Sequence, residues 1–258
     1  MMESRTHEAL VDGQFGARAA AYLGSAVHAR GADLDMLASL AQGRSPTRVL
    51  DLGCGAGHVS FAVASHVEEV VAYDLSAEML DTVSRSAAER GLGNVRTERG
   101  VAEEMPFEDA SFDLVLSRYS AHHWRDLDAG LRETVRTLKP GGIAGFVDAV
   151  SPGSPLLDTH LQAVELLRDP SHVRDYARTE WEAAISRAGL IPGAVAPFRV
   201  RLEFATWTER MGTPTIQVKA IRALQSAASA GVARHFDIGP DGSFDLDVAL
   251  FQASKPAG

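Results

Sequence analysis

Apolar positions recur along the chain in two patterns that alternate from about residue 48 onward. Short runs rich in Val, Ile and Leu predict buried strands, and stretches with apolar residues three and four apart predict helices. The predicted strands span 48–52, 70–74, 94–99, 112–117 and 143–148. The predicted helices follow the first, second and fourth of these strands and span about 59–65, the stretch up to about 90, and 127–138.

Strands that alternate with helices of this length predict βαβ units, a parallel sheet and right-handed crossovers. We therefore expect an α/β fold with a doubly wound sheet. Ligands of such sheets bind outside the carboxyl ends of the strands, near the point where the strand order reverses. The glycine-rich and acidic residues of this chain follow the predicted strand ends, so the expected ligand side of the sheet is also its most polar edge.

The patterns divide the chain into three parts. Residues 1–44 predict an N-terminal helical segment, and 45–150 predict the core with its alternating strands and helices. The alternation breaks after the segment SPGSP, and we expect residues 151–258 to complete the core with the last strands. That part is predicted to contain strands at about 198–204 and 245–252, a helix over 180–188, and helical cap insertions at about 156–178 and 207–234.

Composition narrows the class of protein. The net charge of −9 and the lack of a Lys/Arg run argue against a nucleic-acid partner. No apolar stretch has the ~18–20 residues of a membrane span, and no secretory signal is evident at the N-terminus. Cys54 is the single cysteine, which excludes an intrachain disulfide and a cysteine-rich zinc site. We expect a cytoplasmic protein.

A glycine-rich turn, DLGCGAG at 51–57, follows the first predicted strand. Glycine adopts positive φ and lets the backbone approach a ligand, and the helix that follows presents free N–H groups. Nicotinamide, flavin and adenosylmethionine proteins all use turns of this kind. Here the glycines are spaced GxGxG and not as the GxGxxG fingerprint of dinucleotide binding.

Two acidic residues favour adenosylmethionine at this turn. A carboxylate at Asp51 would repel a dinucleotide pyrophosphate, but it can bind a ligand amine directly or through water. Asp74 ends the second predicted strand, where a ribose diol needs a carboxylate acceptor. The alternative is that Asp74 caps the next helix, a role that Ser76 fills equally well.

Five ordered segments resemble the successive motifs of class I S-adenosylmethionine-dependent methyltransferases, which have a seven-stranded Rossmann-like sheet. The resemblance is greatest to the "type 11" group that includes ubiquinone/menaquinone methyltransferases, and it covers about residues 45–150. The whole chain is also similar to an uncharacterised bacterial subgroup that carries the run SRYSAHHW at 117–124. The five motifs are VLDLGCGAG (49–57), AYDLSAEML (72–80), AEEMPF (102–107), FDLV (112–115) and LKPGG (138–142).

The resemblance implies roles for the matching residues. The turn around Cys54 and Gly57 would hold S-adenosylmethionine (SAM), and the N-terminal segment with Tyr22 and His28 would fold over it as a lid. Relatives often have Asp at the position of Val101, so adenine-edge contacts are expected from Ala102 or Glu103 instead. The remaining implied contacts are Gly53 and Gly55 at the methionine portion, Asp74 at the ribose, Leu75 and Met79 at the adenine face, and Ser117 and Arg118 beside the transferable methyl group.

Candidate catalytic residues follow the fourth and fifth predicted strands. A histidine can remove a proton from the acceptor near neutral pH, and we expect His122 to do so and His123 to be structural. Arg118 and Tyr119 can orient a carboxylate or enolate. Asp148 is a base, a substrate hydrogen-bond acceptor or a helix cap, and Arg174 in the segment 169–176 binds an anionic acceptor or lies in solvent at a helix start. Spacing predicts no metal site.

The sequence therefore predicts a SAM-dependent methyltransferase that forms S-adenosylhomocysteine (SAH) by O- or C-methylation of a hydrophobic or anionic small molecule. One alternative is a non-catalytic SAM-binding sensor or partner protein, because its cofactor site would look the same. The other is an NAD(P)-dependent oxidoreductase, against which the glycine spacing and Asp51 argue. The identity of the acceptor and the oligomeric state stay open.

Overall fold

A computed structural model describes residues 6–16, 31–42 and 47–258 of the chain. Within these residues a seven-stranded sheet has the order β3-β2-β1-β4-β5-β7-β6. Strands β1 to β5 run parallel, whereas β7 pairs antiparallel with both β5 and β6. The strands are β1 Arg48–Leu52, β2 Glu69–Asp74, β3 Val95–Arg99, β4 Phe112–Arg118, β5 Leu138–Ala149, β6 Ile191–Leu202 and β7 Phe244–Ser254. The predicted doubly wound α/β fold is confirmed.

Helices cover both faces of the sheet. On one face α4 and α5 pack together, and on the other α7 packs against α9. Successive residues of β1 pack against opposite helical layers, because Val49 faces the first layer and Leu50 faces the second. The helices are α1 His7–Phe15, α4 Ala32–Ser39, α5 His58–Val63, α6 Ala77–Glu89, α7 Leu127–Thr137, α8 Pro155–Arg168, α9 Arg178–Ala188, α10 Phe204–Arg210, α11 Thr215–Ser226 and α12 Ala230–His235, with short 3₁₀ helices η2 Ala64–His66 and η3 Ala121–His123.

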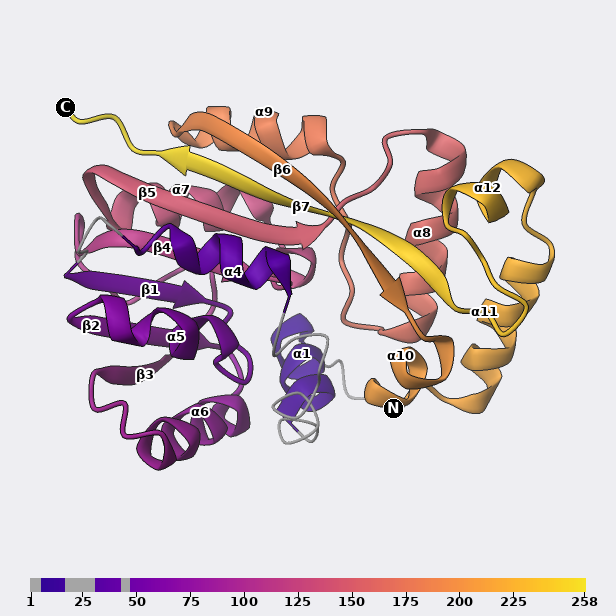
Figure 1. Cartoon of the computed structure of the whole chain (residues 1–258), viewed down its shortest axis with the longest axis horizontal. Helices are drawn as coiled ribbons and strands as arrows, with labels where there is room; N and C mark the ends of the chain where they lie inside the picture. The colour runs from indigo at the N-terminus through magenta and orange to yellow at the C-terminus, as the bar shows by residue number, and fades with distance from the viewer. Residues whose placement is uncertain (1–5, 17–30, 43–46) are drawn as a thin grey trace.

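A helical cap stands beyond the carboxyl ends of the parallel strands. Helices α10 to α12 are inserted between β6 and β7, and α11 and α12 pack on α8. Figure 1 shows the arrowheads of β1 and β5 pointing toward α1 and this cap. The edge of the sheet where ligands are expected is therefore enclosed by α1 and the cap.

Two predicted elements of the C-terminal part were placed wrongly. The strand expected at about 198–204 is β6 and covers Ile191–Leu202, whereas Phe204 already begins α10. Pro192 and Pro197 lie within β6, where proline is tolerated because this strand is at the edge of the sheet. The helical stretch expected up to 178 ends at Arg168, where the carboxylate of Asp169 accepts hydrogen bonds from the next turn instead.

No helix among the described residues is both long and apolar enough to cross a membrane.

Trp181 joins α9 to the sheet, since its side chain is 1% exposed and stacks on Phe251 of β7 with ring centroids 5.1 Å apart. We expect Trp181→Ala to lower the free energy of unfolding by about 3–5 kcal/mol, because the cavity left in this layer cannot collapse. Urea denaturation measures the change. Leu156→Ala, at a 58% exposed position, should change the free energy of unfolding by less than ~0.5 kcal/mol. Equal losses in both variants would contradict the placement of Trp181.

Candidate functional site

The turn between β1 and α5 has three glycines in the left-handed region of backbone conformation. Gly53, Gly55 and Gly57 have φ of 71°, 48° and 86°. A Cβ at Gly53 would overlap the hydroxyl of Ser120, whereas a Cβ at Gly55 would meet nothing within 4 Å. Gly53 is thus required by packing, and Gly55 leaves open space beside the backbone where a ligand can approach.

Asp51 lies at the end of β1 with its side chain buried. Its Oδ2 accepts hydrogen bonds from the backbone N and the Oγ of Ser60, at 2.9 and 2.6 Å. Its Oδ1 is buried and has no hydrogen-bond partner. Burial raises the pKa of Asp51 to about 7, although the hydrogen bonds from Ser60 oppose the shift. A buried acceptor without a donor is costly, so this oxygen is suited to a donor from a ligand.

Asp74 at the end of β2 binds two neighbouring segments of backbone. Its Oδ2 accepts from the N–H of Gly55 at 2.8 Å, and its Oδ1 accepts from the N–H of Ser76 at 2.9 Å. Ser76 precedes α6 but makes no capping hydrogen bond with its own side chain. Asp74 therefore supports the start of α6, and it also holds the glycine turn. A carboxylate has further lone pairs, so these bonds leave room for a ribose hydroxyl.

A cavity with about 1110 Å³ of empty space, open solvent included, lies at this edge of the sheet. Nine of the predicted cofactor residues line it together with Arg118, Tyr119 and His123. The nine are Asp51, Gly53, Cys54, Gly55, Asp74, Leu75, Met79, Ala102 and Glu103. Residues from strand ends, loops and the start of α6, singled out by the sequence motifs, thus face one space.

Two residues predicted to bind the cofactor do not line this cavity, and a third falls outside the described residues. A Cβ at Gly57 would press on Phe61 and Val83, so this glycine serves the packing of α5 against α6. The hydroxyl of Ser117 is buried in the sheet. Tyr22 is the third, and His28, the other residue expected in the lid, also lies outside the described residues.

For Glu103 and Cys54, the structure shows what each side chain does in the lining of the cavity. Oε1 of Glu103 accepts hydrogen bonds from the backbone N of Arg125 and Asp126, at 2.7 and 3.4 Å. That oxygen is therefore used to hold the segment before α7. Burial raises the pKa of the Cys54 thiol well above its usual value, which leaves the sulfur uncharged.

Helix α1 forms a wall of the cavity that the motifs do not identify. His7 and Glu8 line the cavity and also connect α1 to the segment after β4. The His7 Nε2 lies 2.9 Å from the carbonyl oxygen of His123, and the Glu8 carboxylate lies 2.7 Å from the guanidinium of Arg125. Only the helical pattern of this segment indicated an element here, because its polar residues match no motif.

A second, smaller cavity adjoins the first. Phe15, Tyr119 and His123 line both cavities and form their common wall. The second cavity has an apolar side from β6, β7 and α10 and a charged side from α8 and the loop that follows. Its other lining residues are His122, Ala149, Glu165, Arg168, Asp175, Val200, Leu202, Trp207, Arg210 and Leu246.

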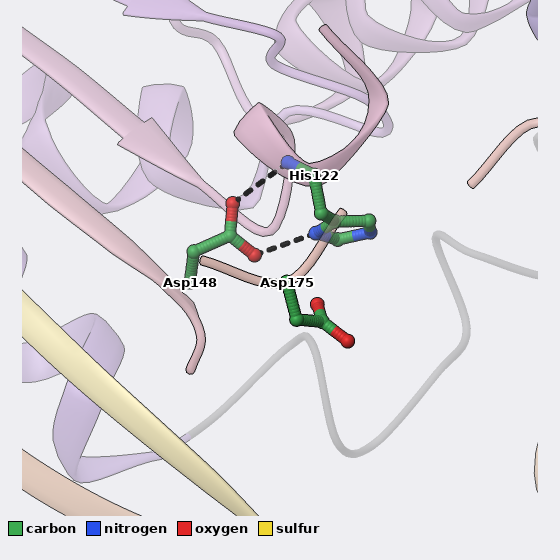
Figure 2. A group of neighbouring side chains, drawn as sticks. All are labelled: His122, Asp148 and Asp175. Atoms are coloured by element: carbon green, nitrogen blue, oxygen red, sulfur yellow. Dashed lines mark hydrogen bonds and ion pairs between the residues drawn. The ribbon is translucent and has the colours of Figure 1, made fainter. Parts of the chain in front are cut away.

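His122 and Asp148 form a hydrogen-bonded pair at this second cavity. The imidazole Nδ1 lies 2.6 Å from Asp148 Oδ1, and the backbone N of His122 donates to Asp148 Oδ2 at 3.2 Å. Burial by itself lowers the pKa of His122, but the charge and the hydrogen bond of Asp148 outweigh it and raise this pKa to about 9. Figure 2 shows Asp148 at the end of its strand holding the histidine from two directions.

His123 and His172 surround His122 as uncharged rings. The ring centroids of His122 and His123 are 4.1 Å apart, and those of His122 and His172 are 5.8 Å apart. Burial, helped by the positive charge of His122, lowers the pKa of His123 to about 3 and that of His172 to about 2. His123 Nδ1 lies 3.1 Å from the carbonyl oxygen of Ser171, so the ring is held in the common wall of the two cavities.

Arg118 and Tyr119 are engaged with α4. The Arg118 guanidinium is buried and donates from Nε to Asp33 Oδ2 at 2.7 Å. It lines the first cavity and not the second. Burial and the nearby Asp33 carboxylate raise the pKa of Tyr119, which adopts a positive φ of 53° between the two cavities. Arg174, proposed from the sequence as an anion binder, pairs with Glu180 at 3.1 Å and lines neither cavity.

Comparisons with known proteins agree with this architecture. Residues 49–142 match the family described as "Methyltransferase domain". The chain is 48% identical to YafE of Escherichia coli K12 over 80% of this chain and 99% of that protein. It is 33% identical to a demethylmenaquinone methyltransferase of Chlorobaculum parvum over 45% of this chain and 46% of that one.

The methyltransferase YcgJ of Bacillus subtilis is similar along nearly its whole length. It is 37% identical over 93% of this chain and 97% of its own. Its crystal structure superimposes with a TM-score of 0.83 over 88% of this chain and 99% of that one, at 36% identity. The chain belongs to the class I SAM-dependent methyltransferases, and it is an enzyme that transfers methyl groups.

The family implies SAM as the cofactor, and the larger cavity has features that fit it. The unpartnered Oδ1 of Asp51 is free to accept a hydrogen bond from a ligand, and no described residue occupies the space beside Gly55. Leu75 and Met79 supply apolar contact surface on the same cavity.

If Asp51 binds the ammonium group of the cofactor, binding depends on pH. Its carboxylate binds an ammonium only when deprotonated, and its pKa of about 7 is above the ordinary value. We therefore expect SAH affinity to be constant above about pH 8 and to fall about tenfold per pH unit below pH 7, as protonation removes the charge. Calorimetric titration across this range measures the effect.

The variant Asp51→Asn should bind SAH at least ~10-fold more weakly at pH 8, since it lacks the charged acceptor. Its affinity should also vary little between pH 6 and 8. A wild-type affinity that is unchanged down to pH 5 would contradict the role of Asp51.

Proposed function

We propose that the protein methylates a small-molecule acceptor at oxygen or carbon, with SAM in the larger cavity and the acceptor in the smaller one. The observation that carries this proposal is the common wall of Phe15, Tyr119 and His123. Methyl transfer requires donor and acceptor in line and close together, and two adjoining cavities provide that arrangement. When bound, SAM supplies an electrophilic methyl group and leaves as SAH.

The cofactor contacts are assigned from the lining of the larger cavity. Asp51 and the turn at Gly53 and Gly55 hold the methionine portion, and Asp74 accepts from the ribose hydroxyls. Leu75 and Met79 pack on the adenine. The edge of the adenine meets the backbone at Ala102, because Oε1 of Glu103 already binds the segment before α7.

The lining of the smaller cavity fits an acceptor with an apolar body and one polar end. Leu202, Trp207 and Leu246 form its apolar side. The polar side carries charges of both signs, from Glu165, Asp175, Arg168 and Arg210. The similarity to a demethylmenaquinone methyltransferase supports a hydrophobic acceptor.

His122 and Asp148 act on the polar end of the acceptor. Asp148 holds the imidazole through both carboxylate oxygens, so the ring keeps one orientation at the cavity. Such support by a buried carboxylate is the usual way in which a catalytic histidine is positioned. His123 stays in the wall between the cavities, where its uncharged ring packs edge-on against Phe15 with centroids 4.9 Å apart.

Two other functions make different experimental predictions. A non-catalytic SAM sensor would bind SAH but transfer no labelled methyl group to any member of an acceptor panel. An NAD(P)-dependent oxidoreductase would bind NADH in a fluorescence titration, against which Asp51 in the cavity argues. For the proposed function we expect SAH binding, no NADH binding, and methyl transfer to phenolic, quinol or enol acceptors.

Removal of the His122 imidazole tests the acceptor site. We expect His122→Ala to lower kcat about 100-fold, the size of a lost acid–base group, while SAH affinity changes less than about twofold. Asp148→Asn should lower kcat as well, by releasing the imidazole from its orientation. The matched control His66→Ala, on an exposed histidine outside both cavities, should leave kcat unchanged. A kcat within a few fold of wild type in both site variants would rule out the assignment.

Filling the smaller cavity tests where the acceptor binds. Val200 lines that cavity but not the larger one, and its half-exposed position on β6 tolerates a larger side chain. We expect Val200→Trp to raise the acceptor KM at least ~10-fold and to leave SAH affinity unchanged, because about two methylenes of mismatch already cost this much. Steady-state kinetics against both substrates measures the change. A variant with weaker SAH binding and an unchanged acceptor KM would show that the acceptor binds outside the smaller cavity.

A further inference from the structure

Three ligand-type side chains meet at the charged side of the smaller cavity. They are His122, Asp148 and Asp175, and each offers one nitrogen or oxygen atom within 4.8 Å of the other two. Figure 2 shows that they come from a short helix, the end of a strand and a loop. The donors therefore belong to elements that are separately anchored in the fold.

Of these three residues, Asp175 is the one with a buried carboxylate oxygen that no hydrogen-bond donor of the described residues contacts. Its side chain is 1% exposed, and its Oδ2 accepts no hydrogen bond. The nearest ionisable nitrogen is Nε2 of His172 at 3.9 Å, which is beyond hydrogen-bond distance and lies against Gln162 Oε1 at 3.0 Å. Burial raises the pKa of Asp175 well above its usual value, and a cation or a donor from outside the chain would relieve the cost of burying this oxygen without a partner.

The charge around the group also favours a cation. Asp148, Asp175 and Glu165 are all buried here, and Glu165 is opposed by Arg168 at 3.5 Å. Asp148 has the imidazole of His122, whereas the positive charges of His122 and Arg168 act on Asp175 without a hydrogen bond to its Oδ2. Because Asp175 and His122 both line the cavity, an ion from solvent can reach them.

We propose that His122, Asp148 and Asp175 bind a divalent transition-metal ion at the acceptor cavity. One imidazole and two carboxylates form a donor set suited to Mn²⁺, Fe²⁺, Co²⁺ or Zn²⁺, with positions left for water or acceptor. His122 Nδ1 and Asp148 Oδ1 are 2.6 Å apart, so an ion bound to both would take the place of the proton between them and move the two atoms to ~3 Å or more. The three positions are too far apart in sequence to form a compact ligand motif, which is why spacing predicted no metal.

The role of the ion rests on the proposed function, with His122 acting as a ligand of the ion instead of as the acid–base group. A cation at this place lowers the pKa of an acceptor hydroxyl in the cavity. The O–H bond then breaks, the proton passes to solvent water, and the electron pair stays on the oxygen that receives the methyl group. The proposal therefore specifies the acceptor as a hydroxylated small molecule with an apolar body.

Binding of Mn²⁺ to the chelator-treated full chain tests the site, with free Mn²⁺ measured by electron paramagnetic resonance. We expect about one ion per chain and its displacement by Zn²⁺, which such donors bind more tightly. Asp175→Asn and His122→Gln should each weaken Mn²⁺ binding at least ~10-fold, because even lost outer-shell partners cost 10–100-fold. The exposed control Asp109→Asn should bind Mn²⁺ as the wild type does.

Failure to bind Mn²⁺ at millimolar concentration, or equal binding by wild type and Asp175→Asn, overturns the metal site. Anomalous scattering from Mn²⁺-soaked wild-type crystals tests the metal site without any variant. A Mn²⁺ peak away from the three side chains also overturns the proposed site. SAH binding by the same wild-type preparation separates the two proposals. A protein that binds SAH but no Mn²⁺ keeps the proposed function and loses only the ion.

Discussion

The binding edge of this protein depends on how the backbone turns after β1. Gly53 and Cys54 donate their N–H groups to the carbonyl oxygen of Tyr73, and Gly55 donates to the carboxylate of Asp74. The end of β2 thus holds the turn in a conformation with positive φ, which only glycine adopts without strain. The cofactor side depends on this turn for two reasons. The turn leaves the space beside Gly55 open, and it starts α5 so that Ser60 donates hydrogen bonds to Asp51.

The acceptor side depends on a different constraint, the cost of burying charge. His122, Asp148, Asp175 and Glu165 lie in or beside a cavity where hydration is limited, and a fold selected for stability alone would replace them with apolar side chains. The pair His122–Asp148 is satisfied within the chain, whereas Asp175 is not. The contrast with the apolar side formed by Leu202, Trp207 and Leu246 defines an amphipathic site.

Local patterns were sufficient for the parallel core and misleading for the cap. Strands β1, β2 and β4 match the apolar runs because strands buried on both faces need such runs. The strand β6 lies at the edge, where prolines are tolerated, and the pattern placed it too late. Helix α8 was predicted too long, because Asp169 ends it by hydrogen bonds to the following turn, which periodicity does not reveal.

The sequence by itself determined the fold class, the family and the residues around the glycine turn, because motif positions, turn chemistry and the alternation of strands with helices are local or nearly local properties. It also singled out His122 and Asp148, but as separate candidates with several roles each. Only the tertiary structure brought them within 2.6 Å, added Asp175 beside them, and made Phe15 of α1 part of the wall between two cavities. These contacts join segments far apart in the chain, and their geometry follows from how the cap and α1 pack on the sheet, which no local pattern encodes.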